Sequence, residues 1–142
     1  MTIRKISKEK YTELIDVWNR AGLPIRSTGR DSYENLERQL ASGRVVVFAD
    51  DHEGNIRGLI LLSHDERKGW INRLAVLPEY RRQGIATRLL KKAEEFFLSA
   101  GIEIFTALIE SDNVTSTQFF EKAGYKMLPD ICYFSKRRKP DI

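Results

Sequence analysis

The stretch INRLAVLPEYRRQGIATRLL, residues Ile71 to Leu90, joins a strand pattern to a helix pattern through a short turn. The segment from Trp70 to Leu77 is rich in branched and apolar residues and stops at Pro78, which is typical of a buried or half-buried strand. Further on, apolar residues recur with helical spacing between charged ones. These positions are Ile85, Leu89, Leu90, Ala93, Phe96, Phe97 and Ala100. The turn RRQGIA, Arg81 to Ala86, therefore leads directly into a helix N-terminus.

A helix N-terminus binds phosphate well because its first N–H groups lack partners and carry partial positive charge. Gly84 would let the backbone come close to such a ligand, and Ala86 is too small to obstruct it. Arg81 and Arg82 add positive charge at the rim. The turn therefore predicts a pyrophosphate site.

Other Gly-containing turns give weaker explanations of this pattern. The dinucleotide fingerprint needs three glycines and a later acidic residue, whereas only Gly84 is present here. A Walker phosphate loop is excluded because Gly-Lys-Ser/Thr is missing. A simple tight turn before a helix remains the structural alternative.

The same residues resemble a known family. The pattern Arg/Gln-x-x-Gly-x-Gly/Ala after a strand is similar to the coenzyme A motif of the GNAT superfamily of N-acetyltransferases. The later segment NVTSTQFFEKAGYK, Asn113 to Lys126, resembles the second motif of that family. The order and spacing of elements fit from Ile3 to Phe134, so the resemblance covers nearly the whole chain.

Composition indicates an ordinary globular protein. The length of 142 residues predicts a single domain, residues 1–142, and the hydrophobic content of 42% and charged content of 31% are usual for a soluble one. The sequence has no apolar run long enough to span a membrane and no signal-peptide core at its start. We therefore expect a cytoplasmic protein that does not bind membranes.

Cysteine and histidine are too sparse for a metal or a disulfide. Cys132 is the single cysteine, and His52 and His64 stand apart from each other. The net charge of +4 is modest, and much of the excess lies in Lys136 to Lys139, within a basic tail expected over residues 136–142. We expect no metal and no nucleic-acid partner, although a basic interaction module using this tail is one alternative function.

Periodicity and breakers predict alternating elements along the chain. The expected strands are Ile3 to Ile6, Val45 to Ala49, Ile56 to Leu62, Trp70 to Val76 and Ile104 to Ile109, with one or two more within Lys126 to Phe134. Four helices are expected. The first is capped by Ser7, the second begins at a capping box of Asp31 and Glu34 and ends at Gly43, the third follows Gly84, and the fourth runs from Asn113 to Gly124. Asp50 to Asn55 is expected to form a turn. This order predicts an α/β fold with an α+β mixed sheet and helices on both faces.

The family resemblance implies more about the fold and the cofactor site. It implies a GNAT-like three-layer α/β/α sandwich whose central sheet splays between the strands at Trp70 and Ile104, with acetyl-CoA as acetyl donor. It implies that Leu74, Ala75 and Val76 present main-chain groups to the pantetheine and that one of their N–H groups polarises the thioester carbonyl. The residues that would surround the pyrophosphate are Arg81, Arg82, Gln83, Gly84, Ile85, Ala86 and Thr87.

The second motif supplies two further cofactor-site candidates. Asn113 resembles the residue of the family that binds the cofactor arm or a nearby water, but it is equally explained as a helix N-cap. Phe120 belongs to the cofactor site by resemblance, and it stands where many members have a tyrosine that protonates the leaving thiolate. Phe120 cannot donate a proton, although Tyr125 or Tyr133 could substitute.

The resemblance implies an N-acetyltransferase that moves acetyl to a primary amine by direct attack in a ternary complex. An amine with a pKa of about 10 must lose a proton before attack. Glu110 is the preferred proton acceptor, with Asp31 and Glu34 as alternatives. The rival function is a non-catalytic acyl-CoA-binding regulatory module. The acceptor, a small-molecule or peptide amine bound near Gly22 to Arg30, is not identified by the sequence, and a homodimer is left open.

Overall fold

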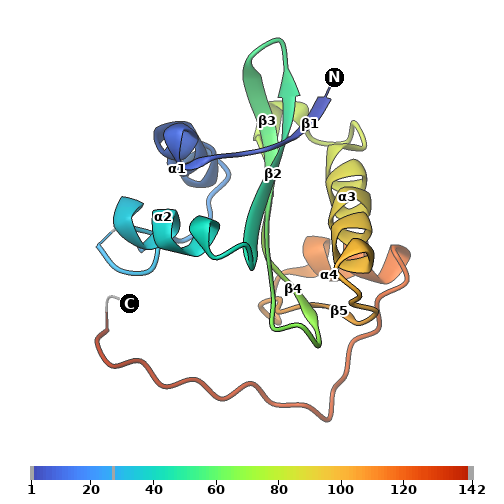
Figure 1. Ribbon diagram of the computed structural model, residues 1–142. Coiled ribbons are helices and arrows are strands. Elements are labelled where there is room, and N and C mark those ends of the chain that lie inside the picture. The colour runs from blue at the N-terminus through green and yellow to red at the C-terminus, as the bar shows by residue number, and fades with distance from the viewer. Residues whose placement is uncertain (1, 27, 141–142) are drawn as a thin grey trace.

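The computed structural model describes residues 2–26 and 28–140, so residue 27 of the predicted acceptor loop and residues 141–142 of the predicted tail lie outside the described chain. Over these residues, a five-stranded sheet lies between two helical layers, with α1 and α2 on one face and α3 and α4 on the other (Figure 1). The elements are β1 Thr2–Lys5, η1 Lys8–Lys10, α1 Tyr11–Arg20, α2 Tyr33–Ala41, β2 Val45–His52, β3 Asn55–His64, β4 Gly69–Val76, η2 Pro78–Tyr80, α3 Ile85–Ser99, β5 Phe105–Ala107 and α4 Val114–Lys122.

The strands follow the chain order β1-β2-β3-β4-β5 across the sheet. The first four pair as antiparallel neighbours, and β5 pairs parallel to β4 after the crossover through α3. Short turns can join antiparallel strands, whereas a parallel pair needs a long connection such as a helix. The predicted α/β fold with a mixed sheet and three layers is therefore confirmed.

Each face of the sheet has its own hydrophobic core. Leu14 and Trp18 of α1 and Leu36 of α2 pack on one face. Leu89 and Phe97 of α3 pack on the opposite face. Alternate residues of β2 and β3 enter the two cores, which explains why these strands read as almost continuous apolar runs.

A bulge in β4 changes which residues reach each core. Leu61 of β3 pairs with Arg73, but its neighbour Leu62 pairs with Ile71, so Asn72 has no partner in β3. Ile71 packs with α3, whereas Ala75, also at an odd position, packs with α1 and α2. The bulge thus turns Arg73 toward the α1 side, where its guanidinium lies over the Trp18 ring.

The pairing of β4 with β5 is short. It joins only Gly69 with Phe105, Trp70 with Thr106 and Ile71 with Ala107. Past Ile71, β4 continues for five residues without β5 beside it, while the chain leaves β5 after Ala107. This opening between the two strands agrees with the splayed central sheet that the family resemblance implies.

The structure corrects three predictions near helix and strand ends. Asp31 does not cap the second helix, because Ser32 is the N-cap and its Oγ accepts from the N–H of Asn35 at 3.2 Å. Ser7 precedes a short 3-10 helix and makes no side-chain cap bond. Asp50 was assigned to a turn, but the strand continues through it to His52, and Asp50 is fully buried.

The predicted strands within Lys126 to Phe134 are wrong. This segment contains no strand and runs below the sheet from α4 toward the α2 side (Figure 1). Pro129 has no N–H to give to a ladder, and a turn forms around it in which the N–H of Ile131 donates to Leu128 O at 3.3 Å. The apolar side chains of the segment are therefore left exposed.

Gly69 is required where α3 crosses the sheet. A Cβ at this position would lie 2.6 Å from the Phe97 ring, closer than two carbon atoms can approach. We predict that Gly69→Ala lowers the free energy of unfolding by about 1–3 kcal/mol, the usual cost of overpacking, in urea denaturation. In a Phe97→Leu background the same change should cost clearly less. An equal cost in both backgrounds would contradict this explanation.

Candidate functional site

The N-terminus of α3 lacks the side-chain caps that begin α2 and α4. The N-terminus of α1 also lacks one, but α1 has the acidic Glu13 in its first turn. Ser32 caps α2 and Asn113 caps α4, but Gly84 precedes α3 with no side-chain cap and no acidic residue in the first turn. The first N–H groups of a helix have no internal partners, and they attract an anion. The α3 N-terminus therefore has the features that favour an external anion.

Two residues of this turn adopt left-handed backbone conformations. Arg82 has a φ of 64° and Gly84 a φ of 79°. A non-glycine residue in this region costs about 1–3 kcal/mol and is common at ligand-binding turns. Alternation of left-handed and right-handed residues directs successive N–H groups into one concavity, which suits an anion.

A buried ionic network holds this turn against the sheet. The Asp50 carboxylate accepts from Arg57 Nε at 2.8 Å and lies 3.6 Å from Arg88 Nη2. Arg88 also donates through Nη1 to the carbonyl of Gln83 at 3.1 Å. The network therefore joins β2 and β3 to the turn. Sequence reasoning missed it because Asp50 was assigned to a turn and nothing local marks its partners.

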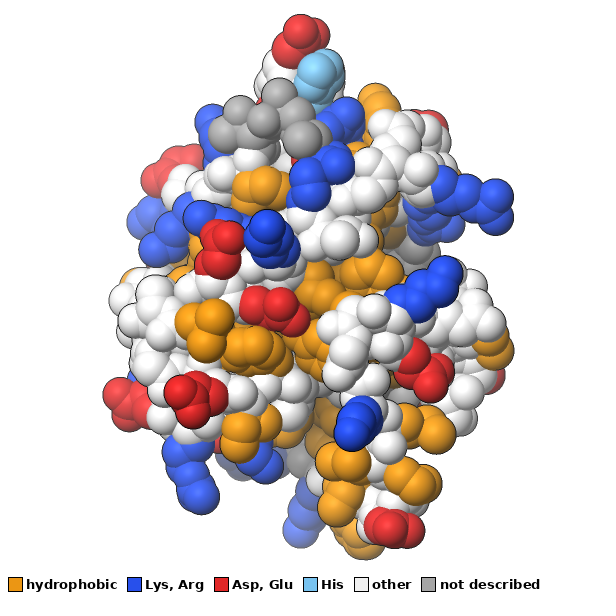
Figure 2. Space-filling view, turned by 90° about the vertical axis from the view of Figure 1, so that its right-hand side faces the viewer, with side chains coloured by type: hydrophobic (Ala, Val, Ile, Leu, Met, Phe, Trp, Pro, Cys, Tyr) orange, Lys and Arg blue, Asp and Glu red, His pale blue; other side chains and the backbone are white. Residues whose placement is uncertain are grey.

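Positive charge surrounds the same region. In Figure 2, which faces the α3 side, Lys and Arg side chains gather mainly in the upper half, where Figure 1 places the first turn of α3. Arg81 and Arg82 are both exposed, and Arg81 Nε donates to the carbonyl of Val76 at 3.1 Å. The structure thus brings the predicted residues from Arg81 to Thr87 together around one turn.

The predicted pantetheine residues lie along the open side of β4. Leu74, Ala75 and Val76 pair with β3 on one side, and β5 does not pair with them on the other. Ala75 is buried toward α1 and α2, and Leu74 and Val76 pack toward α3. These residues therefore combine packing roles with a main-chain edge that β5 leaves unpaired, which is the arrangement that a ligand pairing along β4 needs.

Asn113 and Glu110 lie in the segment between β5 and α4. Asn113 Oδ1 accepts from the N–H of Ser116 at 3.1 Å, which makes Asn113 the N-cap of α4. Its side-chain amide is exposed, so its nitrogen remains a donor for a ligand. Glu110 is exposed three residues past the end of β5, and its carbonyl accepts from the N–H of Asn113 at 2.9 Å.

Phe120 is a core residue of α4. It is 7% exposed and packs edge-on against Phe119 and Tyr125. The Tyr125 hydroxyl donates to Glu94 Oε2 at 2.7 Å. Burial and this carboxylate raise the pKa of Tyr125 far above its usual value, so Tyr125 is a poor substitute for the missing acid.

A hollow of about 350 Å³ lies on the α1 and α2 face of the sheet, where β4 and β5 separate. Ile71, Asn72 and Arg73 line it from β4, and Leu108 lines it from just beyond β5. Asp31 is buried there, and its Oδ2 accepts from Arg73 Nη2 at 2.8 Å and from the Arg26 N–H at 2.7 Å. This ion pair makes Asp31 unsuited to accept a proton from a substrate.

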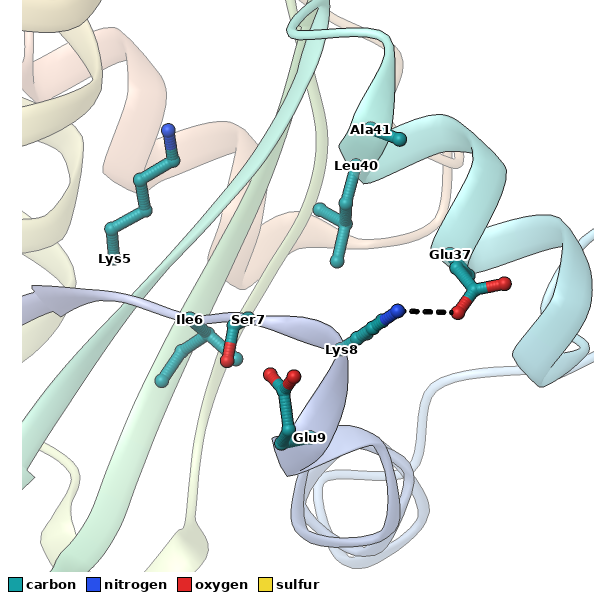
Figure 3. Close-up of a pocket in the computed structure, with 8 residues that line it drawn as sticks. All are labelled: Lys5, Ile6, Ser7, Lys8, Glu9, Glu37, Leu40 and Ala41. Carbon is teal, nitrogen blue, oxygen red and sulfur yellow. Dashed lines mark hydrogen bonds and ion pairs between the residues drawn. The ribbon is translucent and has the colours of Figure 1, made fainter.

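Another hollow, of about 410 Å³, lies between η1 and α2, far from the open side of β4 in the fold. In Figure 3, Lys8 reaches across it to Glu37, with a distance of 2.8 Å between Nζ and Oε2. None of the predicted site residues lines this hollow, so we do not assign it a part in the reaction.

Other chemistry has little support in residues 2–26 and 28–140. No group of three or more His, Cys, Asp or Glu residues there is arranged to hold a metal ion. Cys132 is exposed on the C-terminal segment. Within the same residues, no helix has the length and apolar character needed to cross a membrane.

An uncapped helix N-terminus beside an open strand edge is the arrangement that the family resemblance implies for a coenzyme-binding acyltransferase. Comparison with known proteins agrees, because residues 4–125 match the acetyltransferase (GNAT) family model. The chain belongs to this family, which confirms the predicted class of acetyl-CoA-dependent acetyltransferase.

Individual relatives span nearly the whole chain. Acetyltransferase SG1711 of Sodalis glossinidius is 27% identical over 137 residues, covering 96% of this chain and 95% of its own. The PaiA N-acetyltransferase of Thermoplasma acidophilum, solved in complex with coenzyme A, has a TM-score of 0.77 at 23% identity and covers 88% of this chain and 89% of its own. The aminoglycoside 6'-N-acetyltransferase AAC(6')-IG of Acinetobacter haemolyticus has a TM-score of 0.80 at 20% identity, covering 98% and 100%. The two structures share the fold described above.

The α3 turn gives a direct test of coenzyme binding. We predict that Gly84→Val weakens coenzyme A binding about tenfold or more in calorimetric titration, because a branched side chain distorts the left-handed turn and blocks the N–H groups. Gly101→Val is the matched control, since Gly101 has a similar φ of 81° at the other end of α3. Equal affinities for the two variants, both folded, would contradict the assignment.

Proposed function

We propose that the protein is a cytoplasmic N-acetyltransferase that moves the acetyl group of acetyl-CoA to a primary amine by direct attack in a ternary complex. The observation that carries this proposal is the opening between β4 and β5, which separates an anion-binding turn on the α3 face from a hollow on the α1 and α2 face. Donor and acceptor would enter from opposite faces and meet at the strand edge.

The residues from Arg81 to Thr87 would hold the pyrophosphate through N–H groups and the positive charge around them. Leu74, Ala75 and Val76 would bind the pantetheine through the free side of β4, with the Asn113 amide and the Phe120 region on the α4 side. One N–H of this strand would stabilise the negative charge that develops on the thioester oxygen. Because this N–H is already in position before the reaction, the protein does not need to rearrange when the charge develops.

The reaction forms a bond from the amine nitrogen to the carbonyl carbon, breaks the bond from that carbon to sulfur, and releases one proton. Glu110 is our candidate for the proton acceptor, directly or through water, because it is an exposed carboxylate just past the end of β5. Asp31 is held by Arg73 and Arg26, and Glu34 does not line the hollow at the strand opening.

The leaving thiolate needs no tyrosine at position 120. A thiol with a pKa of about 8.5 leaves as a thiolate without full protonation. Phe120 is buried against aromatic rings, and Tyr125 is engaged with Glu94. Release of the thiolate to solvent is therefore the step that we assign to this chain.

The role of Glu110 is tested by Glu110→Gln. We predict a fall of about 10²-fold or more in kcat/KM at neutral pH, partly recovered at high pH where the amine loses its proton unaided. Glu103→Gln, another exposed carboxylate next to β5, is the control and should keep the original rate. A pH–rate profile unchanged by Glu110→Gln would remove Glu110 from the mechanism.

Phe120→Tyr tests whether an acid is missing. We expect kcat to change less than about tenfold, while the free energy of unfolding falls by about 1–3 kcal/mol because a hydroxyl enters an aromatic core. Steady-state kinetics and thermal unfolding measure the two effects. A large gain in kcat would instead show that protonation of the thiolate limits the natural enzyme.

Cys132→Ala tests whether a cysteine takes part. Because transfer is direct and Cys132 is an exposed thiol, we predict unchanged turnover, also after treatment with a chelator. Loss of more than about tenfold, which is 1.4 kcal/mol of barrier, in a folded sample would point to a covalent or metal-assisted route.

A further inference from the structure

The hollow at the strand opening carries information about the acceptor. Its 350 Å³ is assembled from parts that lie far apart in the sequence: the loop and helix at Arg30 and Gln39, the strand β4 at Trp70 and Arg73, and the C-terminal segment at Tyr133. Ile71 lies at the last paired position of β4, so this hollow reaches the point where the acetyl group would be transferred.

The charged groups of this hollow do not balance. Arg30, Arg73 and Asp31 line it, and the Asp31 carboxylate is already bound by Arg73 Nη2 and by the Arg26 N–H. Among the described residues Arg30 has no ion pair, and it is exposed. One guanidinium charge at the mouth of the hollow therefore lacks a counter-ion.

Arg73 adds to this excess of positive charge. Its side chain is 11% exposed, and its buried Nη1 has no hydrogen-bond partner within the described structure. Burial lowers the pKa of Arg73, and so does repulsion from Arg30, while Asp31 opposes the shift. A bound anion beside Arg30 would offset the repulsion between the two guanidinium groups and stabilise the charged form of both.

The walls favour a flat apolar body. Trp70 and Tyr133 line the hollow together with Leu61 and Leu108. Aromatic and aliphatic walls with a few placed polar groups are typical of small-molecule sites. The charged donors here are Arg30 and Arg73, and Gln39, Ser63 and Asn72 add neutral polar groups.

We propose that the acceptor is a primary amine that also carries a carboxylate, with Arg30 binding the carboxylate at the mouth of this hollow and Arg73 supplying positive charge at its floor. Guanidinium groups bind carboxylates strongly because their planar donors match the two oxygens. This inference rests on the proposed acetyl transfer and specifies its substrate class.

The same charges disfavour a polycationic acceptor. AAC(6')-IG, which shares this fold, is named as an aminoglycoside acetyltransferase. Aminoglycosides carry several amines and would need free carboxylates in the site. Among the described residues, Asp31 is the one carboxylate that lines the hollow, and it is bound to Arg73, while Arg30 would repel a second ammonium group. Proteins that share this fold therefore need not share a substrate.

Matched probes test the proposal with little else changed. We would compare 4-(aminomethyl)benzoate with 4-(aminomethyl)benzamide, and 6-aminohexanoate with 6-aminohexanamide, following thiol release with acetyl-CoA. Each pair differs only at the end remote from the amine. We expect kcat/KM to be about tenfold or more higher for the carboxylate, mainly through KM, as for one hydrogen bond between ionised groups. Kanamycin represents the polycationic class and should react more slowly.

Two variants separate a local contact from general charge. Arg30→Gln should reduce the preference for the carboxylate over the amide to nearly one. Arg38→Gln removes the same charge from an exposed site on α2 outside the hollow and should keep the preference. Equal effects of the two variants would overturn the proposal, as would a preference for the amides or for kanamycin.

A binding measurement keeps the inference testable without turnover. Trp70 lines the hollow, so its fluorescence in coenzyme A-saturated protein should respond to the carboxylates at lower concentration than to the amides, and Trp70→Phe should remove that response. Acetylation without any carboxylate preference would refute only this inference. Absence of acetylation of every amine, with carboxylate binding intact, would refute the proposed function instead.

Discussion

Backbone N–H and C=O groups in a sheet need partners, and β4 lacks a strand on one side beyond Ile71. The bulge at Asn72 occurs at the same place, where it turns the following side chains to the opposite faces. A strand edge in the interior of a protein is costly if nothing pairs with it. A ligand that binds along the strand would remove this cost, which is why we place the pantetheine of the proposed donor there.

The α3 turn is a second place where the fold leaves polar groups unsatisfied. Gly84 gives no cap to α3, and the buried ionic network from Asp50 to Arg88 fixes the turn that carries these N–H groups. Removing Asp50 would leave the largely buried guanidinium of Arg57 and the partly exposed one of Arg88 without this counter-ion, which is destabilising. The geometry of the anion site is therefore supported by interactions that the anion itself does not touch.

The donor side was predictable from the sequence because its parts are local. A strand, a turn with Gly84 and a helix follow one another within about twenty residues, and Asn113 begins α4 as its residue type favours. The acceptor side was not predictable. Asp31 looked like a helix cap, yet Ser32 next to it has that role and Asp31 pairs with Arg73, which is 42 residues away. No local pattern reveals such a pair, nor the bulge that turns Arg73 toward it.

The C-terminal segment is a second part of the structure that the local sequence pattern does not predict. Its apolar residues predict a strand, but Pro129 and the absence of a neighbouring strand leave it unpaired, with Tyr133 at the hollow on the α1 and α2 face. The donor motif is encoded in one continuous segment, whereas the proposed acceptor hollow is assembled from a loop, a helix, three strands, the residue Leu108 beyond β5 and this segment. Substitutions at the acceptor hollow can change its charge and shape without disturbing α3 or its turn. Acceptor specificity can therefore differ between chains that share the same coenzyme site, and in our proposal it depends here on the few charged residues that line the hollow.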